Sequence, residues 1–327
     1  MKPSINGRTG TSSMGEFELI KAYFQRAAHP GDGVAVGVGD DCALLEPAPG
    51  LQLAVTTDTM VCGTHFLAED DPRGLGHKLM AVNLSDIAAM GARPRWAFLN
   101  LTLPGVDPVW LAAFAEGVFA LGARHGVHLA GGDTTRGPLA FGLVVIGEVS
   151  PGQALRRAGA RAGDFICVSG VPGEAAAGLE HRLGRHRLPD ALAARALERL
   201  HRPTPRIELG QALRGRATSA IDISDGLAQD LGHILAAGGV GATVEMERLP
   251  SSPVLDALPS ALARRCQLAG GDDYELLFTL SEEPVPGDWP CPVQVIGRIE
   301  SEPGLRLLEA DGSLVHLERS GHDHFAS

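Results

Sequence analysis

The stretch TSAIDISDGL, residues Thr218–Leu227, carries the pattern that decides the fold. Its first part is apolar and β-branched, which predicts a strand over residues 218–223. Asp222 and Asp225 stand at the end of this strand, and the apolar spacing of a helix begins at Leu227. A strand, an acidic turn and a helix in direct succession indicate an α/β protein.

The same alternation of short apolar runs and helical spacing continues in both directions. We expect further strands over residues 34–38, 51–56, 96–103, 127–130, 141–149, 165–169, 242–246, 274–280 and 293–299. We expect helices over residues 74–90, 175–183, 190–200 and 227–237, and one that starts at Pro108 after the N-cap Asp107. These elements predict a mixed α/β (α+β) protein with mixed sheets flanked by helices.

The segment Pro151–Gly163, which is rich in Gly, Arg and Ala, interrupts this alternation. A chain of 327 residues is also long enough for two domains. We therefore expect an N-terminal domain over residues 15–150 and a C-terminal domain over residues 151–327. Residues 1–14 are polar without an apolar core, and we interpret them as a flexible tail rather than a signal peptide.

Acidic residues gather at the ends of the predicted strands, beside glycines and hydroxyls. The motifs are Gly39-Asp40-Asp41, Thr56-Thr57-Asp58, Gly131-Gly132-Asp133-Thr134-Thr135, Asp222-Ile223-Ser224-Asp225-Gly226 and Gly270-Gly271-Asp272-Asp273-Tyr274-Glu275. Asp86 lies in a predicted helix three residues after Asn83, so both side chains project from one face. Any one of these motifs is ordinary turn chemistry, but five in one chain favour a functional site.

Carboxylates beside hydroxyls suit a hard cation such as Mg²⁺, which takes carboxylate, water and phosphate oxygens. Glycines let the backbone approach a phosphate, and exposed backbone N–H groups bind anions. Several Mg²⁺ ions would also reconcile phosphate substrates with the formal net charge of -11. The chain has neither the Gly-Lys-[Ser/Thr] of a P-loop nor the motif set of protein kinases.

The composition excludes several partners and compartments. A net charge of -11, few aromatic residues and no basic patch argue against nucleic acid and anionic membranes. No apolar run approaches the length of a membrane span. The five cysteines form no Cys-x-x-Cys pair, and their odd number in a chain without an export signal indicates reduced thiols in the cytoplasm.

The motifs, in this order, resemble those of the thiamine-monophosphate kinase family over nearly the whole chain. The matching segments are residues 15–20 (GEFELI), 37–43 (GVGDDCA), 57–58 (TD), 63–66 (GTHF), 83–91 (NLSDIAAMG), 131–134 (GGDT), 221–227 (IDISDGL), 270–276 (GGDDYEL) and 321–325 (GHDHF). The resemblance implies the two-domain fold of the aminoimidazole-ribonucleotide synthetase superfamily and a homodimer formed through the N-terminal domains. It also implies transfer of phosphate from ATP to thiamine monophosphate, which gives thiamine diphosphate.

The resemblance further assigns roles to residues. It implies Mg²⁺ ligands at Asp41, Thr56, Thr57, Asp58, Asp86, Asp133, Asp222 and Asp225. ATP would meet Gly132, Asp133, Arg157 and Ser224, and thiamine monophosphate would meet His65, Asp272 and His322. Many relatives carry an aromatic residue where this chain has His322, which presents a smaller stacking face to the substrate. No protein nucleophile is expected.

Three other functions remain open on the sequence. One is another ATP-dependent synthetase of the same superfamily, although the chain lacks the reactive Cys near the N- or C-terminus that two such enzymes use. The second is a two-metal phosphodiesterase or nuclease, because clustered aspartates also serve that chemistry. The third is a module that binds a phosphorylated ligand without turnover. An acceptor panel with ADP release as the readout separates these functions.

Overall fold

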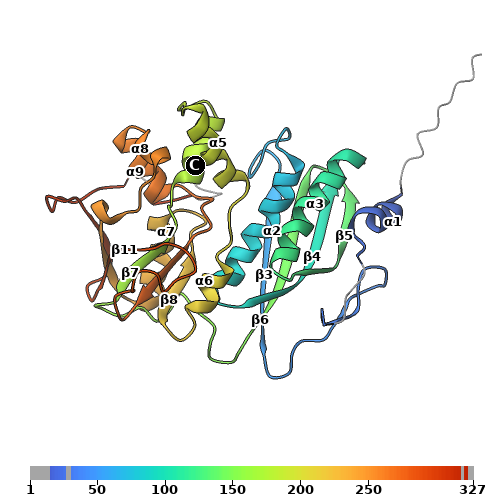
Figure 1. The fold of residues 1–327 in the computed structure, drawn as a ribbon, viewed down its shortest axis with the longest axis horizontal. Helices are drawn as coiled ribbons and strands as arrows, with labels where there is room; N and C mark the ends of the chain where they lie inside the picture. Colours follow the sequence, from blue (N-terminus) through green and yellow to red (C-terminus); the bar gives the residue numbers. More distant parts are fainter. Residues whose placement is uncertain (1–14, 27–30, 318–319, 323–327) are drawn as a thin grey trace, which may run out of the picture.

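The computed structural model describes residues 15–26, 31–317 and 320–322. Two larger β-sheets organise these residues, one in each half of the chain, and Figure 1 shows them side by side. The predicted tail over residues 1–14 and the last residues of the GHDHF motif lie outside the described residues. None of the described helices is both long enough and apolar enough to span a membrane.

The N-terminal half is built on a four-stranded sheet with the order β3-β6-β4-β5. Its strands are β3 (Gln52–Val61), β4 (Arg93–Leu103), β5 (His128–Arg136) and β6 (Ala140–Val149). Strand β6 runs antiparallel to both β3 and β4, whereas β4 and β5 are parallel. Helices α2 (Pro72–Ala89) and α3 (Pro108–Arg124) lie on one face of this sheet (Figure 1). A short helix α1 (Glu16–Leu19), continued by a π-helix (Ile20–Phe24), and a small hairpin of β1 (Val34–Val36) and β2 (Leu44–Leu45) precede it.

The C-terminal half is built on a six-stranded sheet with the order β12-β9-β11-β7-β10-β8. Its strands are β7 (Phe165–Ser169), β8 (Ala217–Asp222), β9 (Gly241–Glu245), β10 (Leu276–Leu280), β11 (Val293–Glu300) and β12 (Gly304–Leu308). Its helices are α4 (Glu174–Arg182), α5 (Asp190–His201), α6 (Ile207–Ala212), α7 (Leu227–Gly238), α8 (Pro253–Asp256) and α9 (Ser260–Ala269), with a 3₁₀ turn over Met246–Arg248. Only β9 and β12 pair in parallel, so the sheet is mixed, as predicted.

Local chemistry explains where the two helices of the N-terminal half begin. Asp71 caps α2 by accepting hydrogen bonds from the backbone N–H groups of Arg73 and Gly74, and Pro72 occupies the first position. Asp107 caps α3 in the same way, as the sequence predicts. The two helices approach so closely that a Cβ on Gly76 would lie 2.1 Å from the carbonyl oxygen of Phe114, so only glycine fits there.

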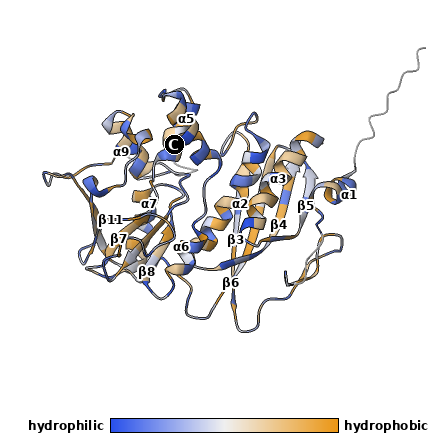
Figure 2. Ribbon diagram, in the orientation of Figure 1, coloured by the Kyte–Doolittle hydropathy of each residue, from blue (hydrophilic) through white to orange (hydrophobic). Residues whose placement is uncertain are grey.

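Helix α2 is the buried centre of the molecule. Its Leu79, Leu84 and Ile87 side chains are almost fully buried against the first sheet, and each contributes on the order of 1.5–3 kcal/mol. On its other side α2 meets α6 of the C-terminal half, where a Cβ on Gly210 would lie 2.0 Å from the carbonyl oxygen of Ala88. Helix α2 therefore joins the two halves. Figure 2 shows that the central strands of both sheets, such as β4 and β7, are mostly hydrophobic.

Two acidic motifs do not lie at strand ends, contrary to the prediction. Thr56, Thr57 and Asp58 lie inside β3, which pairs with β6 over its whole length and continues through the β-branched residues to Val61. The Gly131–Thr135 motif likewise lies inside β5. Strand β10 is shorter than predicted and begins at Leu276, because Asp272 and Tyr274 adopt positive φ angles of 68° and 51°, which no strand allows.

Candidate functional site

Strand β3 and helix α2 form the first wall of the candidate site. Thr56 and Asp58 are two residues apart in β3, so both side chains lie on the face of the strand that meets α2. The hydroxyl of Thr56 donates a short hydrogen bond to the Asp86 carboxylate. The backbone N–H of Asp58 donates to Oδ1 of Asn83 at 3.2 Å, and the Asn83 amide is anchored by the Leu79 carbonyl at 2.9 Å. Each residue is thereby fixed by its neighbour across the strand–helix contact.

Strand β8 brings Asp222 from the C-terminal half to the same place. Asp222 is the last residue of β8, and its side chain is almost fully buried. The hydroxyl of Ser85, which precedes Asp86 in α2, donates to Oδ2 of Asp222 at 2.7 Å. Asp58, Asp86 and Asp222 therefore gather at the junction of the two halves, and we call these three residues the junction acids.

The junction acids repel one another. Burial, followed by the charge of Asp86, raises the pKa of Asp58 to about 6. Burial, followed by the charges of neighbouring aspartates, raises the pKa of Asp222 to about 8, although the hydrogen bond from Ser85 opposes this. Burial also raises the pKa of Asp86, against the hydrogen bond from Thr56 and the positive charge of Arg157. A cation bound among these three carboxylates would favour their ionised forms.

The junction acids fit Mg²⁺ by the chemistry of their donors. They offer only oxygen atoms, which is the donor type that Mg²⁺ prefers, and nearby hydroxyls hold two of them in place. In the described part of the chain, no group of three or more His, Cys, Asp or Glu side chains is arranged to hold a metal ion by itself. Mg²⁺ normally takes one or two carboxylates and completes its shell with water and phosphate, so the arrangement remains suitable.

The loop between β8 and α7 forms the second wall. Oδ2 of Asp230 accepts hydrogen bonds from the backbone N–H groups of Ser224, Asp225 and Gly226 at 3.1, 3.2 and 3.1 Å. Asp230 therefore uses within the protein the N–H groups that a backbone site for an anion would need. Burial raises the pKa of Asp230 to about 6 against these hydrogen bonds. The loop is thereby held rigid beside Asp222.

The turn before β10 places Asp272 next to this loop. The backbone N–H of Asp272 donates to the Ser224 carbonyl at 2.9 Å. One carboxylate oxygen of Asp272 accepts from the Tyr274 hydroxyl at 3.0 Å, and the other lies 3.1 Å from the ammonium of Lys78. Lys78 belongs to α2, so this ion pair also crosses the junction between the two halves.

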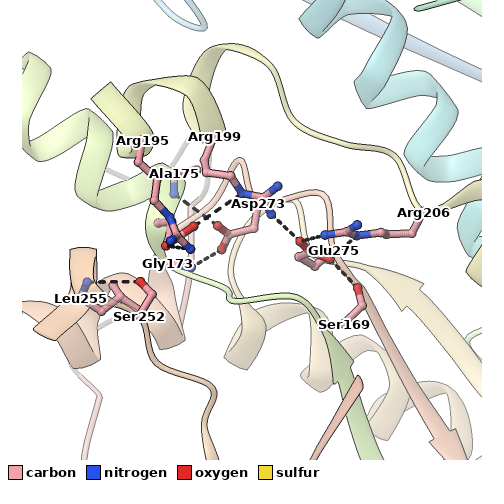
Figure 3. A network of polar contacts seen from close by, with 11 residues as sticks. Ser169, Gly173, Ala175, Arg195, Arg199, Arg206, Ser252, Leu255, Asp273 and Glu275 are labelled. Atoms are coloured by element: carbon pink, nitrogen blue, oxygen red, sulfur yellow. Dashed lines mark hydrogen bonds and ion pairs between the residues drawn. The ribbon is translucent and has the colours of Figure 1, made fainter. Parts of the chain in front are cut away.

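Asp273 and Glu275, which alternate with Asp272 and Tyr274 in this turn, point the opposite way, into the C-terminal half. The Asp273 carboxylate accepts the backbone N–H groups of Gly173 and Ala175 at the start of α4, at 2.7 and 3.5 Å. Glu275 is completely buried and meets the guanidinium groups of Arg199 and Arg206 (Figure 3). Two parallel hydrogen bonds of 2.6 Å join Arg206 to Glu275.

His322 of the GHDHF motif lies against the second wall, the loop between β8 and α7. Its backbone N–H donates to the Asp225 carbonyl at 3.0 Å, and its carbonyl accepts from the Gln229 amide at 2.9 Å. The Gln229 amide also donates to the Asp225 carboxylate at 3.2 Å. The structure therefore brings together the predicted residues Ser224, Asp225, Asp272 and His322, next to Asp222.

Other predicted site residues lie apart from the junction acids. Asp41 lies in an exposed bend, and no hydrogen bond or ion pair between described residues joins it to them. Thr57 is exposed on the opposite face of β3 from Asp58. His65 lies in the turn after β3, where its Nδ1 accepts the backbone N–H of Val61 at 3.0 Å. Gly132 and Asp133 are exposed on β5, at the opposite edge of the sheet from β3.

Comparisons with known proteins agree with this architecture. Models of AIR synthase related proteins match residues 39–149 as the N-terminal domain and residues 161–308 as the C-terminal domain. The chain is 46% identical to thiamine-monophosphate kinase of Salmonella typhimurium, over 96% of this chain and 99% of that protein.

The chain belongs to the thiamine-monophosphate kinase family.

Solved structures support this membership. The chain is similar to the crystal structure of thiamine-monophosphate kinase from Stenotrophomonas maltophilia, with 43% identity, a TM-score of 0.80, and coverage of 88% of this chain and 93% of that one. It is also similar to AaThiL complexed with AMPPCP and TMP, with 31% identity, a TM-score of 0.75, and coverage of 88% and 92%. The predicted family, fold and enzyme class, a kinase, are confirmed.

Some residues of this family member's site were not predicted from the sequence. Lys78, Ser85, Tyr274 and Asp230 all contact predicted site residues. The available signal was helical spacing in α2, because Lys78 and Ser85 are seven residues apart and share one face of the helix. No comparable signal pointed to Asp230, whose partners are backbone groups.

Proposed function

We propose that this enzyme transfers the γ-phosphate of ATP to thiamine monophosphate, which gives thiamine diphosphate. The observation that carries the proposal is the group of junction acids Asp58, Asp86 and Asp222, placed where the two halves meet. Their position in a chain that matches a thiamine-monophosphate kinase over 96% of its length supports phosphoryl transfer over the alternative functions. Neither a phosphodiesterase nor a passive binding module is needed to account for this site.

The proposed roles follow the two walls of the site. Bound Mg²⁺ would neutralise the phosphates of both substrates at the junction acids, with Thr56 and Asp225 beside them. Arg157 is exposed, and its charge acts on Asp86, so its guanidinium can reach an ATP phosphate. Ser224 lies on the second wall beside Asp272 and His322. We assign Ser224 to ATP, and Asp272 and His322 to thiamine monophosphate.

The proposal includes direct transfer, without a phosphorylated enzyme. The carboxylates closest to the proposed phosphate site are the junction acids, and Mg²⁺ bound to them would engage their lone pairs and lower their nucleophilicity. The Nδ1 atom of His65 is occupied by the Val61 N–H group. These groups can bind and orient phosphates, which is most of what phosphoryl transfer requires of a protein.

We also propose a homodimer formed through the N-terminal sheet. Helices α2 and α3 cover one face of this sheet, whereas the other face exposes Leu53, Val55 and Val61 on β3. Asp133 lies on β5, three strand spacings or about 14 Å from β3, so one chain does not bring it to Asp58. A second copy whose β5 edge meets β3 would supply Asp133 and Gly132 to the junction acids.

The first test is ADP release with ATP, Mg²⁺ and a panel of phosphorylated and unphosphorylated acceptors. Thiamine monophosphate is expected to raise ADP formation above every other acceptor, and EDTA is expected to abolish the reaction. Turnover at the full rate in a metal-free preparation, or preference for another acceptor, contradicts the proposal. Incubation with γ-labelled ATP alone tests direct transfer, because label retained on the denatured protein would require a phosphorylated enzyme.

Light scattering tests the dimer. We expect a mass near twice the 34.2 kDa of the chain at micromolar concentration. Val55→Lys on the open face of β3 should give monomers, whereas Val285→Lys, equally exposed outside both sheets, should not. A wild-type mass near that of one chain would contradict the proposal. We propose the cytoplasm as the location, since the cysteine content and the charge favour it.

A further inference from the structure

Lys78 is an unexpectedly buried cation. Only 6% of its side chain is exposed, although it carries an ammonium group at the junction of the two halves. Among the described residues, Asp272 is its sole hydrogen-bond or ion-pair partner, at 3.1 Å. Burying an ammonium is unfavourable unless an opposite charge compensates for it. The pairing with Asp272 therefore offsets the cost of burying the Lys78 ammonium group.

Asp272 is held from three directions. Lys78 contacts Oδ2, the Tyr274 hydroxyl donates to Oδ1, and the backbone N–H is bound to the Ser224 carbonyl. The residue nevertheless keeps 35% of its side chain exposed and adopts a φ of 68°, which is unfavourable for a residue with a Cβ. Both carboxylate oxygens of Asp272 are thus held by a neighbour, and the carboxylate is still exposed. It can therefore accept a hydrogen bond from a ligand in a fixed orientation of its own.

The charge of Asp272 is balanced within the protein. Lys78, 3.1 Å from the carboxylate, is the one cation that forms an ion pair with Asp272 among the described residues. A neutralised carboxylate attracts a positive ring only weakly, but its free lone pairs still accept hydrogen bonds. The pair therefore favours recognition by a hydrogen bond over recognition by charge.

We propose that Lys78 is a positioning residue of the acceptor site: it orients and neutralises Asp272, so that Asp272 accepts a hydrogen bond from an uncharged donor of the acceptor. In thiamine monophosphate the fitting donor is the amino group of the pyrimidine, rather than the positively charged thiazolium. The inference rests on the proposed function, because it assumes that this acceptor binds beside Asp272. It adds a residue of the N-terminal half to a wall that otherwise comes from the C-terminal half.

A double-mutant cycle tests the inference, with thiamine monophosphate as the probe. Lys78→Met and Asp272→Asn are each expected to raise the KM for thiamine monophosphate about tenfold or more, as for loss of a hydrogen bond to a charged group. The KM for ATP and kcat should stay within about twofold, well below that loss. The double variant should be no worse than Asp272→Asn, because Lys78 acts through Asp272. Lys78→Arg should restore most of the affinity.

An analogue separates the two kinds of recognition. Oxythiamine monophosphate carries a carbonyl in place of the pyrimidine amino group, so it cannot donate to Asp272. The wild type should discriminate against it, whereas Asp272→Asn, whose amide can donate, should lose much of this discrimination. Equal discrimination by both enzymes would overturn the assignment of the amino group.

Controls keep each outcome interpretable. Lys21→Met removes an exposed lysine from the short N-terminal helix and should leave all constants unchanged. Thermal unfolding verifies that each variant is folded, and Lys78→Gln replaces Lys78→Met if the latter is not. The inference alone is overturned by any of three results. These are a KM for thiamine monophosphate in the double variant that equals the product of the two single effects, a shifted KM for ATP, and an unchanged KM for thiamine monophosphate. Absence of wild-type turnover with thiamine monophosphate overturns the proposed function as well.

Discussion

Two groups of buried acids lie within the same region but are treated differently by the fold. The junction acids Asp58, Asp86 and Asp222 lie close together. Burial raises the pKa of each, and the charges of neighbouring aspartates raise the pKa of Asp58 and Asp222 further. Glu275, on the other side of the turn that carries Asp272, is fully buried, more deeply than the half-buried Asp58 and Asp86, and meets Arg199 and Arg206. Burial alone would raise the pKa of Glu275, yet these two arginines and Ser169 lower it.

The difference separates a structural acid from the acids that we propose as metal ligands. Glu275 receives its cations from the chain itself, so its charge is satisfied in the folded protein without any ligand. The junction acids receive hydroxyl hydrogen bonds and the exposed Arg157, which leave most of their charge for a cation from solution. The fold thus supplies the counter-charges of Glu275, the completed network, and leaves most of the charge of the junction acids, the open network, without a counter-charge.

The largest expected effect comes from breaking the completed network. Glu275→Gln leaves the half-buried Arg206 without its counter-charge and Arg199 with only Glu174 at 3.7 Å, so we expect the free energy of unfolding to fall by about 3–5 kcal/mol. Denaturant unfolding at pH 7 measures the loss. Glu302→Gln, in an exposed pair with Arg306, is the matched control and should change stability by less than about 1 kcal/mol. Similar losses in both variants would remove the distinction.

A substitution among the junction acids is expected to change the free energy of unfolding less than Glu275→Gln does, but to change catalysis more. Asp86→Asn should reduce kcat more than about 100-fold, beyond the usual effect of residues that only support metal ligands. Stability without Mg²⁺ should be unchanged or higher, because the substitution removes a mutual repulsion. Steady-state kinetics and thermal unfolding check the two parts. If the variant keeps its activity, Asp86 is not a metal ligand. If it loses activity because it unfolds, Asp86 has a structural role like that of Glu275.

The pH dependence of stability sharpens the comparison further. The pKa of Glu275 is lower in the folded protein than its ordinary value of 4.5, so its stabilising charge is present above that pH and is lost in acid. The stability difference between the wild type and Glu275→Gln should therefore be constant from pH 8 down to about 5.5. Below pH 4.5 it should shrink, by at most about 1.4 kcal/mol per pH unit. A difference that grows in acid would contradict the ion-pair assignment.

The smallest effect concerns the substrate side of the open network. His322→Trp should lower the KM for thiamine monophosphate by about 0.5–1 kcal/mol in free energy, since a larger ring offers a better face to the cationic thiazolium. The backbone contacts of His322 with Asp225 and Gln229 do not depend on the side chain, so the wall should persist. An unchanged KM for thiamine monophosphate, or a shifted KM for ATP, would remove His322 from the acceptor site.

The sequence predicts the local elements well where chemistry is local. The strand Phe165–Ser169 and the capped start of α3 at Asp107 agree with the structure. The sequence does not reveal that β3 and β5 continue through their acidic motifs, because strand length is set by pairing with distant strands. It also cannot place the ion pair of Lys78 with Asp272, since only the packing of α2 against the C-terminal half creates that contact.

The candidate site was predictable as a set of residues but not as an arrangement. The motifs named Asp58, Asp86 and Asp222, and the structure brings them together through Thr56 and Ser85. Nothing in the motifs indicates that Asp133 lies on the far edge of the sheet, because strand order is a property of the whole fold. For the same reason the motif GGDDYE gave no sign that Asp273 and Glu275 face away from Asp272.

Helix α2 carries both Lys78 and Asp86, and a straight helix has a fixed rise. Eight residues at about 1.5 Å each place the backbones of Lys78 and Asp86 about 12 Å apart along the helix axis. One rigid element therefore sets the spacing between the residue that orients Asp272 and a residue of the proposed metal site. We expect acceptors whose connection between ring and phosphate is shorter or longer than that of thiamine monophosphate to be phosphorylated more slowly.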